Sequence, residues 1–324
     1  MFTASQLLEK VNAYINSLAY ARHPLGLYEP IQYALSLGGK RIRPVLMLMA
    51  YNLYHEEVDA ILSQAAGIET YHNYTLLHDD LMDKADLRRG KPTVHKVWND
   101  NAAILSGDAM LVLAYQLMAE GCGDHLHEVI QLFSNTAMEI CEGQQLDMEF
   151  ETRMDVTEEE YLEMIRLKTS VLLACSLKIG AMMADASAKD AQALYDFGMN
   201  LGVAFQLKDD LLDVYGDTDK FGKNIGGDIL SNKKTYLLIQ ALRHADETQR
   251  QALNHWIEAE AFNPQEKIAG VTALYNKIGV RALCEEKIAH YTSVAEQNLT
   301  AVNLPEARKS ELAALMRKLM YREA

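Results

Sequence analysis

The chain has 324 residues, of which 49% are hydrophobic and 23% charged, a composition typical of a globular protein with a large core. Its 31 Lys and Arg residues against 45 Asp and Glu residues give a formal net charge of −14, which argues against binding to nucleic acid or to an anionic membrane surface. No Ser-, Gly- or Pro-rich linker divides the chain, so we expect a single domain over residues 1–324.

Helices dominate the expected structure. None of the six prolines lies between Pro92 and Pro264, and proline breaks the interior of a helix. Strong helix formers such as Leu, Ala, Met, Glu and Gln fill this stretch. The short apolar runs lack the regular turn signals of a β-sandwich. The sequence therefore predicts an all-α fold.

The expected location is the cytoplasm. The four cysteines form no CxxC pair and have no neighbouring histidine at metal-ligand spacing, which favours a reducing compartment. The N-terminal residues lack the basic and apolar segments of a signal peptide. We find no apolar run of the roughly 18 residues that a membrane span requires, so we expect no membrane span.

The first segment with chemical interest combines a basic loop with an acidic helix. Residues 38–44 read GGKRIRP, with three cations just before a helix expected to begin near Pro44. Apolar residues at helical spacing then predict a buried helix that ends in HNYTLLHDDLMD. Within it, Asp79 and Asp83 are four residues apart and therefore lie on one face. His72 falls on nearly the same line.

Two short basic segments follow along the chain. Residues 88–92 read RRGKP and come one short turn after the acidic helix. Paired arginines favour bidentate recognition of phosphate oxygens. Lys168 and Thr169 lie in a later helical stretch, where the lysine is also consistent with a side chain that merely follows the helix surface.

A second acidic helix resembles the first. Leu194, Phe197, Leu201 and Phe205 form an apolar stripe that leads into QLKDDLLD. The polar residues Gln206, Asp209, Asp210 and Asp213 occupy a neighbouring face. The loop that follows is rich in glycine and lysine, including Lys223 and Lys233, and suits a lid over phosphate groups.

The two acidic clusters predict a site for a metal ion and a phosphate-bearing substrate. One such cluster alone is equally consistent with a solvated helix end, but two nearly identical patterns are not. Oxygen ligands without His or Cys suit Mg²⁺, with Mn²⁺ as a substitute. Because Mg²⁺ held by few carboxylates takes its other ligands from water and substrate phosphates, we expect a phosphate between the two helices.

In this order, the motifs closely resemble those of the trans-isoprenyl diphosphate synthases, which include farnesyl and geranylgeranyl diphosphate synthases. The resemblance covers residues 37–236 and rests on GGKRIRP, HNYTLLHDDLMD, ADLRRGKPTVH, GQxxD, LKTS, FQLKDDLLD and GKNIGGDILSNKKTY. It implies long antiparallel helices around a deep central cavity, a homodimer, and condensation of an allylic diphosphate with isopentenyl diphosphate.

The resemblance also implies roles for individual residues. Three carboxylates would bind Mg²⁺: Asp79, Asp83 and Asp209. Three further carboxylates would support them: Asp80, Asp210 and Asp213. Four cations would hold the allylic diphosphate: Arg88, Lys168, Lys223 and Lys233. Four groups would hold isopentenyl diphosphate: Lys40, Arg43, His72 and Arg89. Two polar side chains would face the reacting carbons: Thr169 and Gln206.

Product length is expected to depend on the first acidic helix. Thr75 lies one turn below Asp79 and is small enough to let a prenyl tail pass, so Tyr71, a further turn down, is a candidate floor. Tyr74 occupies the position that the family most often uses to stop elongation, although an ideal helix directs it away from the carboxylates. Both tyrosines are equally compatible with ordinary core packing. We expect a farnesyl or geranylgeranyl product.

Two alternatives use parts of the same pattern. A class I terpene cyclase also ionises an allylic diphosphate with Mg²⁺, but it needs no second diphosphate site and normally carries Asn or Ser with Glu in its second metal motif. A non-catalytic regulatory subunit of a prenyl synthase usually lacks one acidic cluster or the basic residues, and both are present here.

Overall fold

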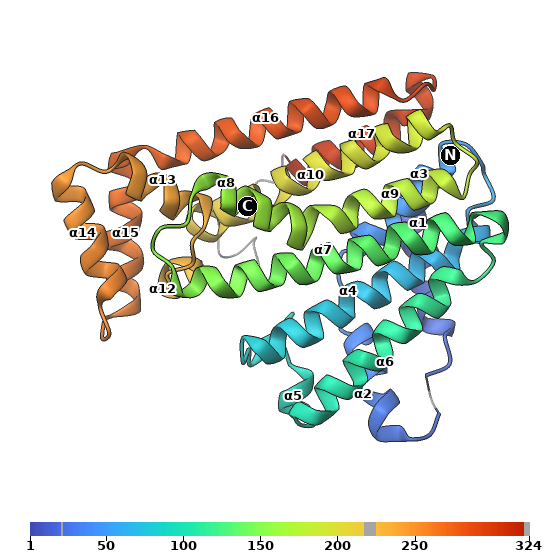
Figure 1. Ribbon diagram of the computed structural model, residues 1–324, viewed down its shortest axis with the longest axis horizontal. Helices are drawn as coiled ribbons and strands as arrows, with labels where there is room; N and C mark the ends of the chain where they lie inside the picture. Colours follow the sequence, from blue (N-terminus) through green and yellow to red (C-terminus); the bar gives the residue numbers. More distant parts are fainter. Residues whose placement is uncertain (21, 217–224, 321–324) are drawn as a thin grey trace. The chain divides into compact units, whose positions relative to one another are not determined.

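The structure is a computed structural model that describes residues 1–20, 22–216 and 225–320 (Figure 1). Within these residues the strands are the two-residue β1 (Leu87–Arg88) and β2 (Lys91–Pro92), paired antiparallel, and helices make up most of the rest. The predicted all-α class is thus confirmed. The helices up to residue 125 are α1 (Ala4–Ser17), α2 (Leu25–Ser36), α3 (Ile42–Asn52), η1 (Val58–Ile61), α4 (Leu62–Met82), α5 (Val94–Val97), α6 (Asp100–Ala119) and η2 (Gly123–His125).

The helices after residue 125 include the longest ones. They are α7 (Leu126–Thr152), α8 (Glu158–Ile165), η3 (Arg166–Ser170), α9 (Val171–Met182), α10 (Ala188–Tyr215), α12 (Gly227–Leu230), α13 (Tyr236–His244), α14 (Glu247–Glu258), α15 (Pro264–Ile278), α16 (Val280–Ala301) and α17 (Glu306–Met320). The segment η3 is a turn of π-helix.

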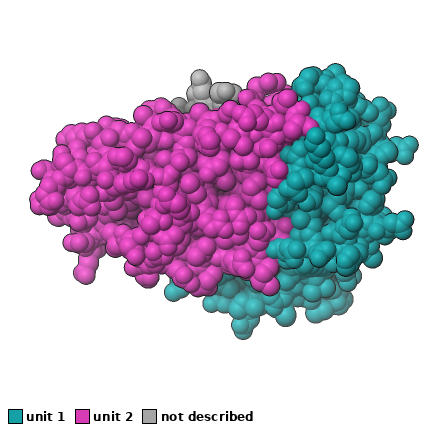
Figure 2. Space-filling model, turned by 45° about the horizontal axis from the view of Figure 1, so that its top comes forward, with its two compact units in different colours: residues 1–135, 175–195, 302–312 teal, residues 136–174, 196–301, 313–324 magenta. Residues whose placement is uncertain are grey.

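The chain divides into two compact units, which Figure 2 colours separately. Unit 1 consists of residues 1–135, 175–195 and 302–312, and unit 2 of residues 136–174, 196–301 and 313–324. The division does not follow the order of the chain, and α7 and α10 each contribute to both units. A single domain over residues 1–324 stays a prediction.

In unit 1, α4 and α6 pack side by side in opposite directions (Figure 1). Gly67 in the first half of α4 lies against the backbone of Ala114, near the end of α6. His78 near the end of α4 lies 3.2 Å from the carbonyl oxygen of Ile104, near the start of α6. A Cβ on Gly107 would lie 2.1 Å from Nε2 of His78, so a side chain at this position would displace the His78 ring.

Among the described helices, α6 is a candidate membrane span by length and composition, although it contains no uninterrupted apolar run of about 18 residues. The helix α6 has an 18-residue window of mean hydropathy 1.5 and meets the criteria of length and composition. The helix begins with Asp100 and Asn101, and Ser106 and Asp108 interrupt its apolar residues, so its average hydropathy is high without a continuous apolar run. Core helices of soluble proteins meet the same criteria, and 39% of this window is buried, so α6 is weak evidence for a span.

Unit 2 has a core into which the helix before the π-turn inserts. Thr157 begins α8 with a capping box, in which its hydroxyl accepts from the backbone N–H of Glu160 and the Glu160 carboxylate accepts from the N–H of Thr157. The helix then buries Tyr161 in a cluster that includes Leu207 and Cys284. This packing fixes the position of α8 and of the π-turn that follows it.

Candidate active site

The first acidic cluster lies at the C-terminal end of α4, in unit 1. The backbone N–H of Asp83 donates to the carbonyl oxygen of Asp79 at 2.9 Å, so these two residues are one helical turn apart, as predicted from their spacing. The helix ends because Lys84 adopts a left-handed conformation with φ of 52°. Asp79 is half-buried, Asp83 is exposed and Asp80 is buried.

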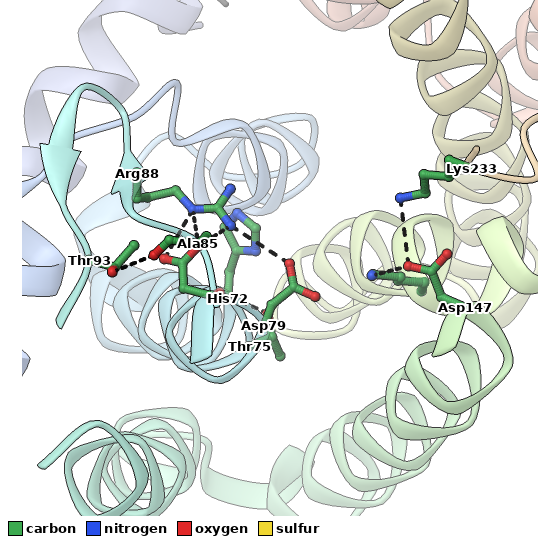
Figure 3. Close-up of polar contacts among 10 residues, drawn as sticks. His72, Thr75, Asp79, Ala85, Arg88, Thr93, Asp147 and Lys233 are labelled. Atoms are coloured by element: carbon green, nitrogen blue, oxygen red, sulfur yellow. Dashed lines mark hydrogen bonds and ion pairs between the residues drawn. The ribbon is translucent and has the colours of Figure 1, made fainter. Parts of the chain in front are cut away.

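A tight hairpin brings Arg88 back to this cluster. Arg89 and Gly90 have φ of 53° and 74°, which gives the two-residue loop the conformation that antiparallel strands favour. From β1, Arg88 donates from Nε and Nη2 to Oδ1 of Asp80 at 2.9 and 2.5 Å, and its Nη2 lies 3.7 Å from Oδ2 of Asp79 (Figure 3). Burial raises the pKa of Asp80 despite the opposing effect of Arg88.

The basic loop before α3 directs one of its arginines inward. Arg41, with φ of 46°, is 5% exposed and donates to Oε1 of Glu69 and to the carbonyl oxygen of Leu35, both at 2.6 Å. Asn73 also donates to Oε1 of Glu69, at 3.0 Å. Glu69, which no local sequence pattern signals, anchors the loop that carries Lys40 and Arg43.

Arg43 and His72 form the centre of a cationic cluster. Nη1 of Arg43 lies 3.1 Å from Nε2 of His72, and because a guanidinium only donates, this nitrogen must accept and the imidazole is neutral. Burial and the charges of Arg43 and Arg89 lower the pKa of His72 well below its ordinary value. Burial likewise lowers the pKa of Arg43, to about 10.

Arg89 joins this cationic cluster from the hairpin. Its Nη1 donates to the carbonyl oxygen of Gly38, and its guanidinium lies against Gly39, where a Cβ would come within 2.7 Å of it. Burial lowers the pKa of Arg89, and the nearby charge of Arg41 adds to this effect. The structure brings Arg43, His72 and Arg89 together, whereas Lys40 is exposed in the loop before α3.

In unit 2, the π-turn η3 carries Lys168 and Thr169. A Cβ on Gly143 of α7 would lie 2.4 Å from the backbone nitrogen of Lys168, and a Cβ on Gly202 of α10 would lie 2.5 Å from Cα of Ser170. Two helices therefore approach the turn through glycines. Such a turn often marks a functional position, because it redirects side chains that a regular helix would place elsewhere.

Lys168 and Lys233 share a carboxylate. The ammonium group of Lys168 donates to Oδ2 of Asp147 at 2.6 Å, and that of Lys233 lies 3.7 Å from the same oxygen (Figure 3). Burial alone would raise the pKa of Asp147, but the two lysines outweigh it and lower the pKa. Asp147 is the last residue of the GQxxD motif, and only the structure shows that it lies between the two lysines.

The second acidic cluster lies on α10. Asp209 is half-buried and Asp210 is 4% exposed. Oδ2 of Asp213 accepts from the backbone N–H of Asp228 at 3.0 Å and so holds the start of α12. Gln206, one turn before Asp210, accepts from the hydroxyl of Thr169 at 3.2 Å.

Aromatic side chains line α4 below the first cluster. The ring of Tyr71, which is 1% exposed, lies 5.2 Å from that of Phe133 and 5.5 Å from that of Tyr74, measured between centroids. Tyr74 in turn packs against His78 at 4.8 Å. The hydroxyl of Thr75 donates to the carbonyl oxygen of its own helix at His72. Phe133, from α7, could not be assigned to this row from the sequence.

The predicted site residues thus fall into two groups that are each coherent. Those in unit 1 are Lys40, Arg43, His72, Asp79, Asp80, Asp83, Arg88 and Arg89, and those in unit 2 are Lys168, Thr169, Gln206, Asp209, Asp210, Asp213 and Lys233. Lys223 lies outside the described residues. Among the residues described, no three His, Cys, Asp or Glu side chains converge as a complete metal site. Oxygen from a substrate or water would therefore have to complete any coordination shell.

Comparison with known proteins shows which family the chain resembles over most of its length. A short chain isoprenyl diphosphate synthase of Methanocaldococcus jannaschii is 42% identical over 254 residues, which cover 78% of this chain and 77% of that protein. A geranylgeranyl diphosphate synthase of Methanosarcina mazei is 41% identical over 233 residues, or 71% and 72% of the two chains. A crystal structure of a geranylgeranyl pyrophosphate synthase superposes with a TM-score of 0.95 at 42% identity and covers 100% of both chains.

The superposition confirms the expected isoprenoid synthase fold. The polyprenyl synthetase family model matches residues 25–276, which is most of the chain. A match of this extent, together with relatives of this identity, means that the chain belongs to the polyprenyl synthetase family.

Proposed function

We propose that this chain condenses dimethylallyl, geranyl or farnesyl diphosphate with isopentenyl diphosphate to give farnesyl or geranylgeranyl diphosphate and free diphosphate. Short-chain prenyltransferase activity is the activity for which its relatives are named, and the family acts on allylic and isopentenyl diphosphates. The observation that carries the proposal is the divergence of two adjacent arginines. Arg88 turns towards the acidic cluster, and Arg89 turns towards the cationic cluster of Arg43 and His72.

This divergence fits two anionic substrates. The guanidinium of Arg88 lies beside the first acidic cluster and would contact an anion held there by a metal ion. Arg89 and Arg43 offer positive charge for a second anion elsewhere in the same unit. A neutral His72 adds a donor to the second group without adding charge, because its Nε2 accepts from Arg43 and its proton therefore resides on Nδ1. We assign isopentenyl diphosphate to Lys40, Arg43, His72 and Arg89.

We assign a divalent metal to the acidic clusters. The family depends on a divalent metal ion, and the oxygen-only donor set of Asp79, Asp83 and Asp209 favours Mg²⁺, with Mn²⁺ as a substitute. When bound, Mg²⁺ would neutralise the charge that develops on the departing diphosphate. Asp80 supports the ligands through Arg88, and Asp213 supports them through its bond to the start of α12.

The remaining residues act on the allylic substrate. Lys168 and Lys233, which share Asp147, are assigned to its diphosphate, because a phosphate group can compete with that carboxylate for both ammonium groups. The oxygen atoms of Thr169 and Gln206 are assigned to the face of the allylic cation, where dipoles stabilise positive charge. The double bond of isopentenyl diphosphate attacks the cation, and the released diphosphate accepts the proton lost afterwards.

The same features rank the alternatives. A class I terpene cyclase needs no second anion site, so the cationic cluster of Arg43, His72 and Arg89 argues against a cyclase. A regulatory subunit has no need of the hydrogen bonds that hold Arg88 against Asp80, nor of the π-turn that presents Lys168. Both alternatives predict that diphosphate release does not depend on the two substrates together.

Prenyl length is assigned to the aromatic row on α4. Tyr71 is buried against Phe133 and Tyr74, so a growing tail that passes Thr75 would meet a wall of rings. A wall at this depth supports a short product. The assignment includes Tyr74, whose ring contacts both Tyr71 and His78.

We further propose a cytoplasmic homodimer. The argument for association is a set of exposed apolar side chains on α6, where Leu105 and Val112 are 60% and 58% exposed and two helical turns apart on one face. A second copy of the chain would remove this surface from water. Val112→Arg should then convert a dimer to a monomer in analytical ultracentrifugation, and a wild-type monomer at all concentrations would refute the proposal.

A diphosphate-release assay tests the proposed reaction. Wild-type protein with Mg²⁺ should release diphosphate only when an allylic diphosphate and isopentenyl diphosphate are both present. Asp79→Ala should lower this rate by about 10²- to 10³-fold, because it removes a group that stabilises the leaving diphosphate. Circular dichroism should show unchanged helix content. Release from the allylic substrate alone would support the cyclase instead.

A further inference from the structure

A buried tyrosine in unit 2 begins a chain of hydrogen bonds that ends beside the residues assigned to the allylic cation. The hydroxyl of Tyr161 donates to Oδ2 of Asp210. The amide Nε2 of Gln206 donates to Oδ1 of the same carboxylate at 3.1 Å. The hydroxyl of Thr169 donates to Oε1 of Gln206 at 3.2 Å. Tyr161 therefore connects to Thr169 through three consecutive hydrogen bonds.

Tyr161 is far from water and keeps its proton. Its side chain is 1% exposed and packs among buried residues that include Leu207, Leu211 and Cys284. Burial raises the pKa of this phenol well above its ordinary value, and the charge of Asp210 adds to the effect. The hydroxyl is thus a permanent donor, and Oδ2 of Asp210 has a fixed partner.

The chain of bonds determines which way the Gln206 amide faces. The NH₂ group of Gln206 donates to Oδ1 of Asp210, whose other oxygen accepts from the Tyr161 hydroxyl. Burial raises the pKa of Asp210 to about 7, and this arrangement of donors belongs to its ionised form. The amide oxygen must then turn towards Thr169, whose hydroxyl supplies a proton to it. If Asp210 were free to rotate, the amide could reverse and present NH₂ hydrogens, which repel a developing positive charge.

We propose that Tyr161 is a positioning residue for prenyl transfer, which acts through Asp210 to keep the oxygen of Gln206 on the side of the allylic cation. The proposal rests on the proposed function, because it presumes that an allylic cation forms near Gln206. Tyr161 itself touches no substrate. This role explains why the hydroxyl of the buried Tyr161 donates to Asp210, the second residue of an acidic motif, and not to a backbone carbonyl group.

Tyr161→Phe tests the role, because it removes the hydroxyl and retains the ring. Under single-turnover conditions with Mg²⁺ and both diphosphates, we expect the rate of product formation to fall about tenfold, the effect of one hydrogen bond to a charged group. KM for both substrates should change less than about twofold, because the substrate diphosphates are held by other residues. Tyr275→Phe, at a tyrosine of the same core that is 3% exposed, is the matched control and should leave the rate unchanged.

A double-mutant cycle separates positioning from a merely structural role. In a Gln206→Leu background there is no amide to orient, so Tyr161→Phe should lower the rate by less than about twofold. An equal loss in both backgrounds would overturn the proposal, and so would a full rate in Tyr161→Phe. Asp210→Asn, measured in the same cycle at saturating Mg²⁺ so that weaker support of the metal ligands is compensated, gives an independent answer should Tyr161→Phe unfold. It should also lose its effect in the Gln206→Leu background, and additive losses would again refute the role. If the wild-type protein forms no prenyl product at all, the proposed function fails, and the proposal fails with it.

Discussion

Nη1 of Arg43 lies 3.1 Å from Nε2 of His72, so an arginine donates to a histidine that must stay neutral. The pKa of His72 is held well below its ordinary value by burial and by the surrounding arginines. Because His72 stays neutral in the folded protein, the cationic cluster makes the free energy of unfolding depend on pH.

His72→Gln should make the protein less sensitive to acid. The unfolded chain takes up a proton at His72 as the pH falls below about 6.5, whereas the folded chain does not, so the folded state loses stability there. The wild-type free energy of unfolding should fall relative to His72→Gln by up to roughly 1.4 kcal/mol per pH unit in this range. Urea unfolding in EDTA at several pH values measures it, with His127→Gln at an exposed position as control. Parallel curves for wild type and His72→Gln would contradict the geometry.

The two arginines of the hairpin should affect different substrates. Arg88→Ala should raise KM for the allylic diphosphate about tenfold, and Arg89→Ala should raise KM for isopentenyl diphosphate by a similar factor, because each loses charge-assisted hydrogen bonds to one anion. Steady-state kinetics with each substrate varied in turn measures both. Lys91→Ala, exposed on β2, should change neither. Equal effects of both arginines on both substrates would remove the basis for two separate anion sites.

Gly202→Ala should destabilise unit 2 and slow the reaction. The new Cβ would lie 2.5 Å from Cα of Ser170, so α10 or the π-turn must move, at a cost of about 1–3 kcal/mol. Because the turn carries Lys168 and Thr169, kcat should fall as well. Gly26→Ala, where a Cβ meets nothing within 4 Å, is the control and should change stability by less than about 1 kcal/mol. Thermal unfolding that is unchanged in Gly202→Ala would show that the close approach is not required.

Tyr71→Ala or Tyr74→Ala should lengthen the product by at least one isoprene unit, because truncation opens the aromatic row in which Tyr71 contacts Phe133. A buried ring also contributes to stability, so Tyr71→Ala should lower the free energy of unfolding by about 3–5 kcal/mol. Chromatography of the dephosphorylated products measures chain length. Folded, active variants of both kinds that still release the wild-type product would place the limit elsewhere.

The acidic helices were predictable because their signal is local. Asp79 and Asp83 follow an apolar helix at a spacing of four, and the structure places them one turn apart at its end. The hairpin was not predicted, because the sequence placed RRGKP only one short turn after the acidic helix; the structure shows Arg89 and Gly90 as the two-residue loop between β1 and β2. The long stretch without proline and the abundance of strong helix formers also predicted the all-α class, and the apolar stripes that lead into the two acidic clusters belong to α4 and α10.

Partners distant in sequence were not predictable. The loop GGKRIRP offers three cations that the sequence cannot distinguish, and only the fold turns Arg41 inward to Glu69, 28 residues away. Tyr161 meets Asp210 across 49 residues, so nothing local signals their bond. A π-turn at Lys168 is likewise invisible in propensity, because the neighbouring helices impose it through Gly143.

The masses of the products test the central claim most directly. Purified protein should be given isopentenyl diphosphate and Mg²⁺ with dimethylallyl, geranyl or farnesyl diphosphate in separate reactions, and the products analysed by mass spectrometry. The account predicts farnesyl or geranylgeranyl diphosphate as the longest product and no product in excess EDTA. The absence of any product longer than the starter, or condensation undiminished by EDTA, would contradict it.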